Sequence, residues 1–188
     1  MSKPTPAVFL DRDGVINASP GTGYVRSWEE FAFLPGTLEA IRDLHRAGFR
    51  LVVVSNQRGI AQRLYSQAAV EEITTRMTAA VMEAGGALDA VFYCAHLETA
   101  GCACRKPQRG MIDQACARYP TDLSRSFMVG DDLKDILLGQ ATGCRTILVL
   151  SGRTGPEAPA TWARLPDQIC QDLRAAADWI LAQAGDSR

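Results

Sequence analysis

The stretch Ala7-Val8-Phe9-Leu10-Asp11-Arg12-Asp13-Gly14 decides the fold, because it joins an apolar run to two carboxylates and a glycine. Four consecutive hydrophobic residues bounded by polar ones are typical of a buried strand. Asp11 and Asp13 are two residues apart, so their side chains can lean toward the same cavity. The sequence therefore predicts a buried strand with two acids at its carboxyl end and a tight exit at Gly14.

Downstream of this strand, short apolar runs alternate with amphipathic stretches. The apolar runs predict further strands at residues 50–55, 88–93, 126–129 and 146–150. The amphipathic stretches predict helices at residues 36–48, 66–84, 109–119, 133–142 and 168–184. Such alternation predicts a parallel sheet with helices on both faces, in which ligands bind beyond the carboxyl ends of the strands.

The size and composition of the chain are those of an ordinary globular protein. Its 188 residues predict a single domain over residues 1–188, and hydrophobic residues make up 47% of it. Lys plus Arg number 20 against 21 for Asp plus Glu, so no global basic field exists to recruit nucleic acid or anionic lipid. No apolar run approaches the ~20 residues that cross a bilayer. The polar segment 1–6 is unlike a signal peptide, and we expect a cytoplasmic protein.

A second pair of acids follows the fourth predicted strand, in Gly130-Asp131-Asp132. If this strand lies beside the first, Asp131 faces Asp11 and Asp13. Three unpaired carboxylates in one crevice would repel one another, and Mg²⁺ resolves this because it prefers oxygen ligands. We expect Asp132 to reach substrate or a metal-bound water and Asp135 to lie behind the site or at a helix N-terminus. The alternative is a set of solvated loop acids.

Groups suited to binding phosphate follow the second and third strands. Ser55, Asn56 and Gln57 offer neutral donors, and Arg105 and Lys106 offer two cations. A phosphoryl transition state carries negative charge on three oxygens and needs such groups around it. The alternative is an ordinary turn and two solvated surface cations. The shared sheet edge favours the functional interpretation.

The loop at residues 94–104 has the pattern C-x-H-x₅-C-x-C, formed by Cys94, His96, Cys102 and Cys104. Three thiols and one imidazole suit a closed tetrahedral Zn²⁺ site, which leaves no open position and is therefore structural. A disulfide is disfavoured in a reducing compartment. The alternative is a coincidental cluster of small hydrophobic residues. Bound zinc would fix the backbone that carries the two cations that follow.

Together, these clusters resemble the haloacid dehalogenase superfamily of phosphatases over residues 8–150. The resemblance implies a Rossmann-like three-layer α/β fold with a five-stranded parallel sheet in the order 5-4-1-2-3. It implies that Asp11 is the nucleophile and Asp13 the general acid/base, with Mg²⁺ held by Asp11, the Asp13 backbone carbonyl and Asp131. Because the connections after the first two strands are short, we expect a capless or small-cap form.

The cysteine motif narrows the resemblance to the branch that acts on heptose bisphosphates and histidinol phosphate. The heptose-bisphosphate group is the more similar, which implies a Mg²⁺-dependent phosphatase of a small phosphorylated sugar in lipopolysaccharide core synthesis. Catalytic contacts are then expected from Ser55, Arg105 and Lys106. Substrate contacts are expected from Asn17, Gly21, Thr22, Gly23, Tyr24, Asn56, Gln57, Arg58 and Asp132. Arg58 stands where this branch has a small residue, and the loop at residues 17–24 is about two residues longer than is typical.

Three alternatives remain on the sequence. The first keeps the chemistry but takes histidinol phosphate as substrate. The second is a zinc-stabilised interaction module without activity, against which the intact Asp11, Asp13, Lys106 and Asp131 argue. The third is a nucleic-acid end phosphatase, which the balanced charge disfavours. We expect a monomer without nucleic-acid or membrane partners.

Overall fold

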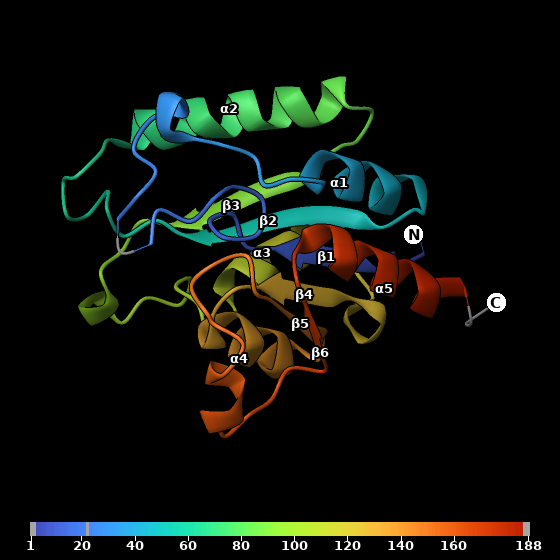
Figure 1. Cartoon of the computed structure of the whole chain (residues 1–188). Helices are drawn as coiled ribbons and strands as arrows, with labels where there is room; N and C mark the ends of the chain where they lie inside the picture. Colours follow the sequence, from blue (N-terminus) through green and yellow to red (C-terminus); the bar gives the residue numbers. More distant parts are fainter. Residues whose placement is uncertain (1–2, 22, 186–188) are drawn as a thin grey trace.

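The computed structural model describes residues 3–21 and 23–185, so Thr22, expected in the substrate loop, lies outside the described residues. Six parallel strands form one sheet in the order β3-β2-β1-β4-β5-β6 (Figure 1). Their bounds are Ala7–Leu10 for β1, Arg50–Asn56 for β2, Ala90–Cys94 for β3, Phe127–Gly130 for β4, Arg145–Val149 for β5 and Gln168–Cys170 for β6. The first five strands stand in the predicted order, which confirms the expected fold class.

Helices cover both faces of the sheet because alternate strand residues point to opposite sides. Val8 and Leu10 belong to the core beneath three helices: α1 (Thr37–Arg46), α2 (Gln67–Glu83) and α5 (Leu173–Gly185). Ala7 and Phe9 belong to the core on the other face, beneath α3 (Gly110–Arg118) and α4 (Leu133–Thr142). Short 3₁₀ turns lie at Trp28–Glu30, Glu98–Ala100, Leu123–Arg125 and Ala158–Thr161. Figure 1 shows α1 and α2 above the sheet and α4 below it.

The predicted closing helix at residues 168–184 is wrong at its start. Residues Gln168–Cys170 form β6, and α5 begins at Leu173. The Leu150 amide donates to the Cys170 carbonyl at 3.0 Å, and the Asp167 carboxylate accepts from the Thr146 amide at 2.6 Å. These contacts add a short edge strand whose three residues are too few to show a strand period.

The sheet register brings the ends of three strands together. Leu10 of β1 pairs with Val53 of β2 on one side and with Val129 of β4 on the other. The residues that follow these strands therefore meet at one edge. Between β1 and α1 the chain forms turns and one 3₁₀ turn, and between β2 and α2 it forms turns. Within residues 3–21 and 23–185, no cap domain covers this edge, as expected.

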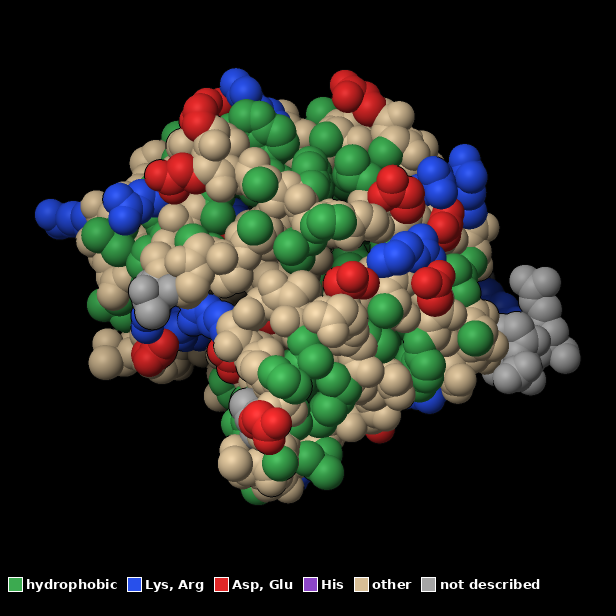
Figure 2. All heavy atoms as spheres, viewed as in Figure 1, with side chains coloured by type: hydrophobic (Ala, Val, Ile, Leu, Met, Phe, Trp, Pro, Cys, Tyr) green, Lys and Arg blue, Asp and Glu red, His purple; other side chains and the backbone are tan. Residues whose placement is uncertain are grey.

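The described helices include none with the length and apolarity of a membrane span. Figure 2 shows acidic and basic side chains interspersed over the visible face of the molecule, without a continuous basic band among the residues described there.

Candidate active site

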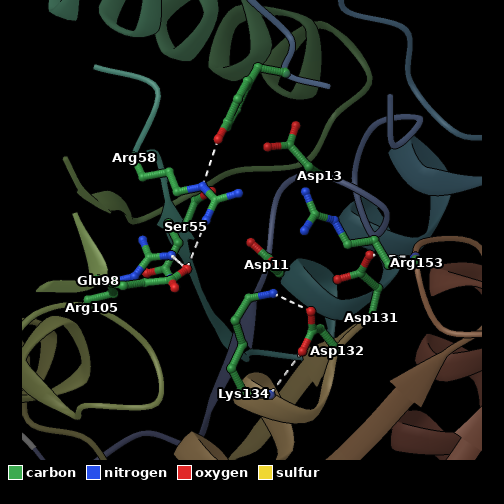
Figure 3. A pocket seen from close by; sticks show the side chains of 12 residues that line it. Asp11, Asp13, Ser55, Arg58, Glu98, Arg105, Asp131, Asp132, Lys134 and Arg153 are labelled. Carbon is green, nitrogen blue, oxygen red and sulfur yellow. Dashed lines mark hydrogen bonds and ion pairs between the residues drawn. The ribbon is translucent and has the colours of Figure 1, made fainter. Parts of the chain in front are cut away.

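A cavity of about 280 Å³ opens at the carboxyl edge of the central strands. Its aspartates follow the ends of β1 and β4, Glu98 comes from the loop after β3, and its arginines come from loops on opposite sides (Figure 3). The lining residues are Asp11, Asp13, Tyr24, Ser55, Asn56, Arg58, Glu98, Arg105, Asp131, Asp132, Lys134 and Arg153. The polar clusters that follow the first, second and fourth strands thus share one cavity, together with Arg105 from the loop after the third.

Asp11 and Lys106 form a buried ion pair at the base of the site. The Lys106 Nζ lies 2.8 Å from Oδ1 of Asp11 and 2.7 Å from Oδ1 of Asp135. Burial opposes the charge of Lys106, but the two carboxylates outweigh it and raise the pKa of the ammonium. The Arg12 amide also donates to Oδ1 of Asp11 at 2.7 Å. No described residue hydrogen-bonds the other oxygen, Oδ2, of this pocket-lining carboxylate.

Asp13 is held as a carboxylate by three neighbours. The Arg12 guanidinium contacts both of its oxygens at 2.9 and 3.0 Å, and Asn17 and Gln57 each donate an amide hydrogen at 3.0 Å. Burial alone would raise the pKa of Asp13, but the Arg12 charge and these hydrogen bonds lower it below its usual value. Asn17 and Gln57, which we expected at the substrate, thus lie behind Asp13 and support it.

The carboxylates Asp11, Asp131 and Asp135 lie close enough to share a metal ion. One oxygen from each lies within 4.8 Å of the others, and all three residues are buried. Burial, followed by the charges of Asp11 and Asp135, raises the pKa of Asp131 to about 7. Lys106 pairs with Asp11 and Asp135 but not with Asp131, so the three buried carboxylates keep an excess of negative charge that a divalent cation would balance. Hard oxygen donors of this kind fit Mg²⁺.

Gly14 is required beside this cluster. Its φ is +86°, and a Cβ at this position would lie 2.3 Å from Oδ2 of Asp131. A side chain here would be strained and would displace the carboxylate. Glycine is therefore required at position 14 for two reasons: the tight turn predicted after β1, and the close approach of the Asp131 carboxylate.

The start of α4 carries two acids of the site. Asp132 caps the helix by accepting from the Lys134 amide, and the Asp135 carboxylate accepts from the Asp132 amide at 3.2 Å. This capping box fixes both side chains on a rigid helix end. Asp132 also pairs with the Lys134 ammonium at 2.7 Å at the pocket surface. We expected Asp135 behind the site or at a helix N-terminus. It lies in the first turn of α4 and, at the same time, contacts Lys106 behind the cavity.

Residues at the carboxyl end of β2 build one wall of the cavity. The Ser55 hydroxyl is buried and accepts a hydrogen bond from Gln57 at 2.9 Å. The Asn56 side chain accepts from the Lys106 amide at 3.0 Å and donates to the Lys106 carbonyl at 3.2 Å. Asn56 therefore ties the end of β2 to the segment that carries the buried lysine.

The rim of the cavity holds three arginines. Glu98 pairs with Arg58 at 2.9 Å and with Arg105 at 2.8 Å, and Tyr24 accepts a hydrogen bond from Arg58 at 2.7 Å. Arg153 projects into the cavity from the opposite side (Figure 3), and its backbone amide donates to Asp131 at 2.8 Å. Two arginines on one side and one on the other make the entrance suitable for an anionic substrate.

The predicted zinc ligands converge. Cys94 Sγ lies 3.1 Å from Cys104 Sγ and 3.6 Å from Cys102 Sγ, and His96 Nδ1 lies 3.2 Å from Cys104 Sγ. All four ligand atoms lie within 4.8 Å of one another, and none of the cysteines forms a disulfide. Burial, followed by the neighbouring thiols, raises the pKa of Cys94 to about 12, so a free thiol here stays protonated. Three sulfurs and one imidazole nitrogen fit a tetrahedral Zn²⁺.

The sequence reasoning missed Glu98, Lys134 and Arg153 as cavity residues. Arg153 follows β5, and the rule that sites lie beyond strand ends offered a signal for it. Glu98 lies within the predicted zinc loop, and Lys134 follows Asp132 directly. In the longer loop, Gly21 lines a second cavity that Arg58 and Arg153 share, whereas Gly23 lines neither cavity.

Relatives of known name match this chain over nearly its whole length. A HAD-hydrolase-like family model matches residues 103–176. A D-glycero-β-D-manno-heptose-1,7-bisphosphate 7-phosphatase of Bordetella bronchiseptica is 38% identical over 179 residues, which cover 94% of this chain and 98% of the relative. The protein of that name from Escherichia coli K12 is 36% identical over 194 residues, which cover 99% of this chain and 93% of the relative.

Solved structures agree with these matches. The crystal structure of D,D-heptose 1,7-bisphosphate phosphatase from B. bronchiseptica, complexed with magnesium and phosphate, matches with a TM-score of 0.88 and covers 95% of this chain and 99% of that one. The enzyme from Burkholderia thailandensis matches with a TM-score of 0.71 at 34% identity and the same coverage. The chain therefore belongs to the D-glycero-D-manno-heptose-1,7-bisphosphate 7-phosphatase family of the HAD superfamily.

Proposed function

We propose that the protein is a Mg²⁺-dependent phosphatase that removes the 7-phosphate of D-glycero-D-manno-heptose 1,7-bisphosphate, in the synthesis of lipopolysaccharide core heptose. The observation that carries this proposal is the buried pairing of Asp11 with Lys106 at the base of an arginine-rimmed cavity. The heptose-bisphosphate relatives support the substrate.

Asp11 is the proposed nucleophile. Its Oδ1 is occupied by Lys106 and by the Arg12 amide, so Oδ2 is the oxygen that attacks phosphorus. The attack forms an Asp11 oxygen–phosphorus bond as the bond from phosphorus to the sugar oxygen breaks. Water then attacks the aspartyl-phosphate, releasing inorganic phosphate and restoring the carboxylate. Lys106 orients the Asp11 carboxylate for this attack.

Asp13 is the proposed general acid and base. Its protonated form gives a proton to the departing sugar oxygen, and the resulting carboxylate takes a proton from the attacking water. One turnover thus returns Asp13 to its starting state. The contacts with Arg12, Asn17 and Gln57 favour the carboxylate, which is the form needed to activate water.

The carboxylates of Asp11 and Asp131 and the backbone carbonyl of Asp13 are the proposed Mg²⁺ ligands, with Asp135 adjacent. When bound there, Mg²⁺ neutralises phosphate charge and balances the excess of buried carboxylates. Ser55 and Arg105 are the proposed further contacts to the transferred phosphate, because both line the same cavity.

Recognition of the rest of the substrate is assigned to the rim. A bisphosphate has a second phosphate outside the reaction centre, and Arg58, one of the three arginines of the rim, is the proposed cation that binds it. Tyr24 and Asp132 line the same cavity and are the proposed contacts to sugar hydroxyls, together with Asn56 and the glycine loop at residues 21–23.

We propose a structural Zn²⁺ ion whose ligands are Cys94, His96, Cys102 and Cys104. The loop that carries these ligands leads directly into Arg105 and Lys106, so a fixed loop fixes both cations. Three thiols that lie close together without a disulfide support a reducing, cytoplasmic location. We also propose that the chain is a monomer and that it forms one domain; a single sheet with helices on both faces supports the single domain.

The test of this function is the identity of the product. Purified protein with Mg²⁺ is incubated with heptose 1,7-bisphosphate, and phosphorus NMR follows both phosphate resonances. Loss of the 7-phosphate signal with retention of the 1-phosphate signal is expected. Loss of the 1-phosphate first, or no release of phosphate, would contradict the proposal.

A further inference from the structure

Gln57 joins the two sides of the reaction centre. It is 1% exposed, and its Nε2 donates both to Asp13 Oδ2 at 3.0 Å and to Ser55 Oγ at 2.9 Å. One amide group therefore holds the proposed acid/base and a phosphate-contacting hydroxyl at once. The contact with Asp13 requires the NH₂ side of the amide to face the site, because a carboxylate can accept but not donate, and the Ser55 hydroxyl accepts from the same nitrogen.

Tyr65 fixes the direction of that amide. Its hydroxyl donates to Oε1 of Gln57 at 2.7 Å, and Tyr65 is 8% exposed. Burial is the main reason that the pKa of Tyr65 rises to about 12, so the hydroxyl keeps its proton and remains a donor. A flipped amide would lose the hydrogen bond to Asp13 and turn its oxygen toward that carboxylate, so the Tyr65 hydroxyl, as a donor to Oε1, supports the orientation that Asp13 requires.

The chain makes specific room for this tyrosine. A Cβ at Gly59 would lie 2.2 Å from the Tyr65 ring, so Gly59 allows the ring to reach Gln57. The amide of Leu64 donates to the Gly59 carbonyl at 2.9 Å and closes the turn that brings Tyr65 back to the site. The Tyr24 ring packs against Tyr65 with centroids 5.7 Å apart. Neither Tyr65 nor Gln57 lines the cavity, so both act from behind it.

We propose that Tyr65 is a positioning residue for phosphoryl transfer, which acts through Gln57 to hold Asp13 and Ser55 in their working orientation. The inference rests on the proposed phosphatase function. It requires that loss of the Tyr65 hydroxyl lowers kcat and leaves KM unchanged, because the hydroxyl touches no substrate. It also requires that loss of the Tyr65 hydroxyl no longer lowers kcat once the Gln57 amide has been removed.

The test compares Tyr65→Phe, Gln57→Met and the double variant by phosphate release from heptose bisphosphate under saturating Mg²⁺. Tyr65→Phe is expected to lower kcat about three- to tenfold, the effect of one neutral hydrogen bond, with KM within twofold of the parent. Adding Tyr65→Phe to Gln57→Met is expected to change kcat by less than about twofold. Tyr119→Phe is the matched control, because it loses a tyrosine hydrogen bond of 2.9 Å to the Asp89 carbonyl, away from the cavity.

An unchanged kcat in Tyr65→Phe, a rise in KM alone, or losses that multiply in the double variant would each overturn the inference. If Tyr65→Phe does not fold, the test rests on Gln57→Met. An unchanged kcat in that variant would overturn the proposed positioning of Asp13 and Ser55 by Gln57. A parent protein that releases no phosphate overturns the proposed function instead, whereas an active parent with an unaffected Tyr65→Phe overturns this inference alone.

Discussion

The ammonium of Lys106 lies 2.8 Å from Oδ1 of Asp11, and both residues are almost fully buried. Asp135 holds the same ammonium from the other side at 2.7 Å. A buried ion pair of this kind stabilises little by itself, because removing both charges from water offsets the attraction. Its effect is on geometry: it commits one oxygen of Asp11 to the protein and leaves the other for chemistry.

Replacing Asp11 with Asn removes the nucleophilic charge but hardly changes the shape of the side chain. We expect Asp11→Asn to lower the rate of phosphate release by more than about 10³-fold, because the covalent route has no substitute. The fold should survive, since Asp135 still pairs with Lys106. Asp113→Asn, which removes an exposed partner of Arg109 on α3, is the control and should retain full activity. Release within tenfold of the parent by Asp11→Asn would exclude the aspartyl-phosphate.

The two proposed metals should differ in how easily they leave. Elemental analysis of protein purified without chelator should find about one zinc per chain, because thiolates retain Zn²⁺. Brief EDTA treatment should stop activity, and added Mg²⁺ should restore it. Cys102→Ala should lose the zinc, lower the Tm and raise KM through Arg105, whereas Cys116→Ala should keep the zinc. Protein without zinc would refute the site.

Arg58 should govern the preference for a second phosphate. Arg58→Met is expected to lower kcat/KM for the bisphosphate about 10- to 100-fold while changing that for a sugar monophosphate by less than about threefold. Arg76→Met is the matched control, since it removes an arginine that pairs with Glu72 on the exposed face of α2. Equal losses on both substrates would assign Arg58 to the transferred phosphate or to folding.

The contact between α1 and α5 should make stability depend on pH. Arg174 on α5 donates to Asp43 on α1 at 2.8 Å, and this hydrogen bond is the main reason that the pKa of Asp43 lies below 3.8. A lowered folded-state pKa adds stability above the unfolded value, and that stability is lost as the pH falls through the folded value. Arg174→Gln should therefore cost about 0.5 kcal/mol at pH 7.

At a strongly acidic pH, below the lowered folded-state pKa of Asp43, that cost should shrink toward zero, because Asp43 is then protonated in both proteins. Urea unfolding at the two pH values measures the difference. Arg46→Gln, at the exposed end of α1, provides a control without a recorded ion pair among the described residues. A cost that is equal at both pH values would assign the effect of Arg174 to packing.

The sequence was sufficient for the aspartates of the cavity, because they follow apolar runs that predict strands, and the family resemblance implied the order of the first five strands. The spacing of Cys94, His96 and Cys104 along the chain likewise predicted that their side chains converge. The strand at residues 168–170 was missed because an edge strand this short shows no period.

Side-chain contacts between segments that are distant in the sequence could not be predicted from it. Three such contacts depend on the direction in which side chains point. Lys106 lies between Asp11 and Asp135, Glu98 pairs with two arginines, and Asn56 hydrogen-bonds the Lys106 backbone. Spacing along the chain carries no information on such directions once two segments come from different strands.

The most direct test of the account is the ratio of kcat/KM for heptose 1,7-bisphosphate to that for histidinol phosphate, measured on one preparation with Mg²⁺. Histidinol phosphate carries an ammonium and lacks the second phosphate, so the arginines of the rim would repel its ammonium and would have no second phosphate to bind. We predict a ratio above about 10² in favour of the bisphosphate. Equal values, or a preference for histidinol phosphate, would contradict the account.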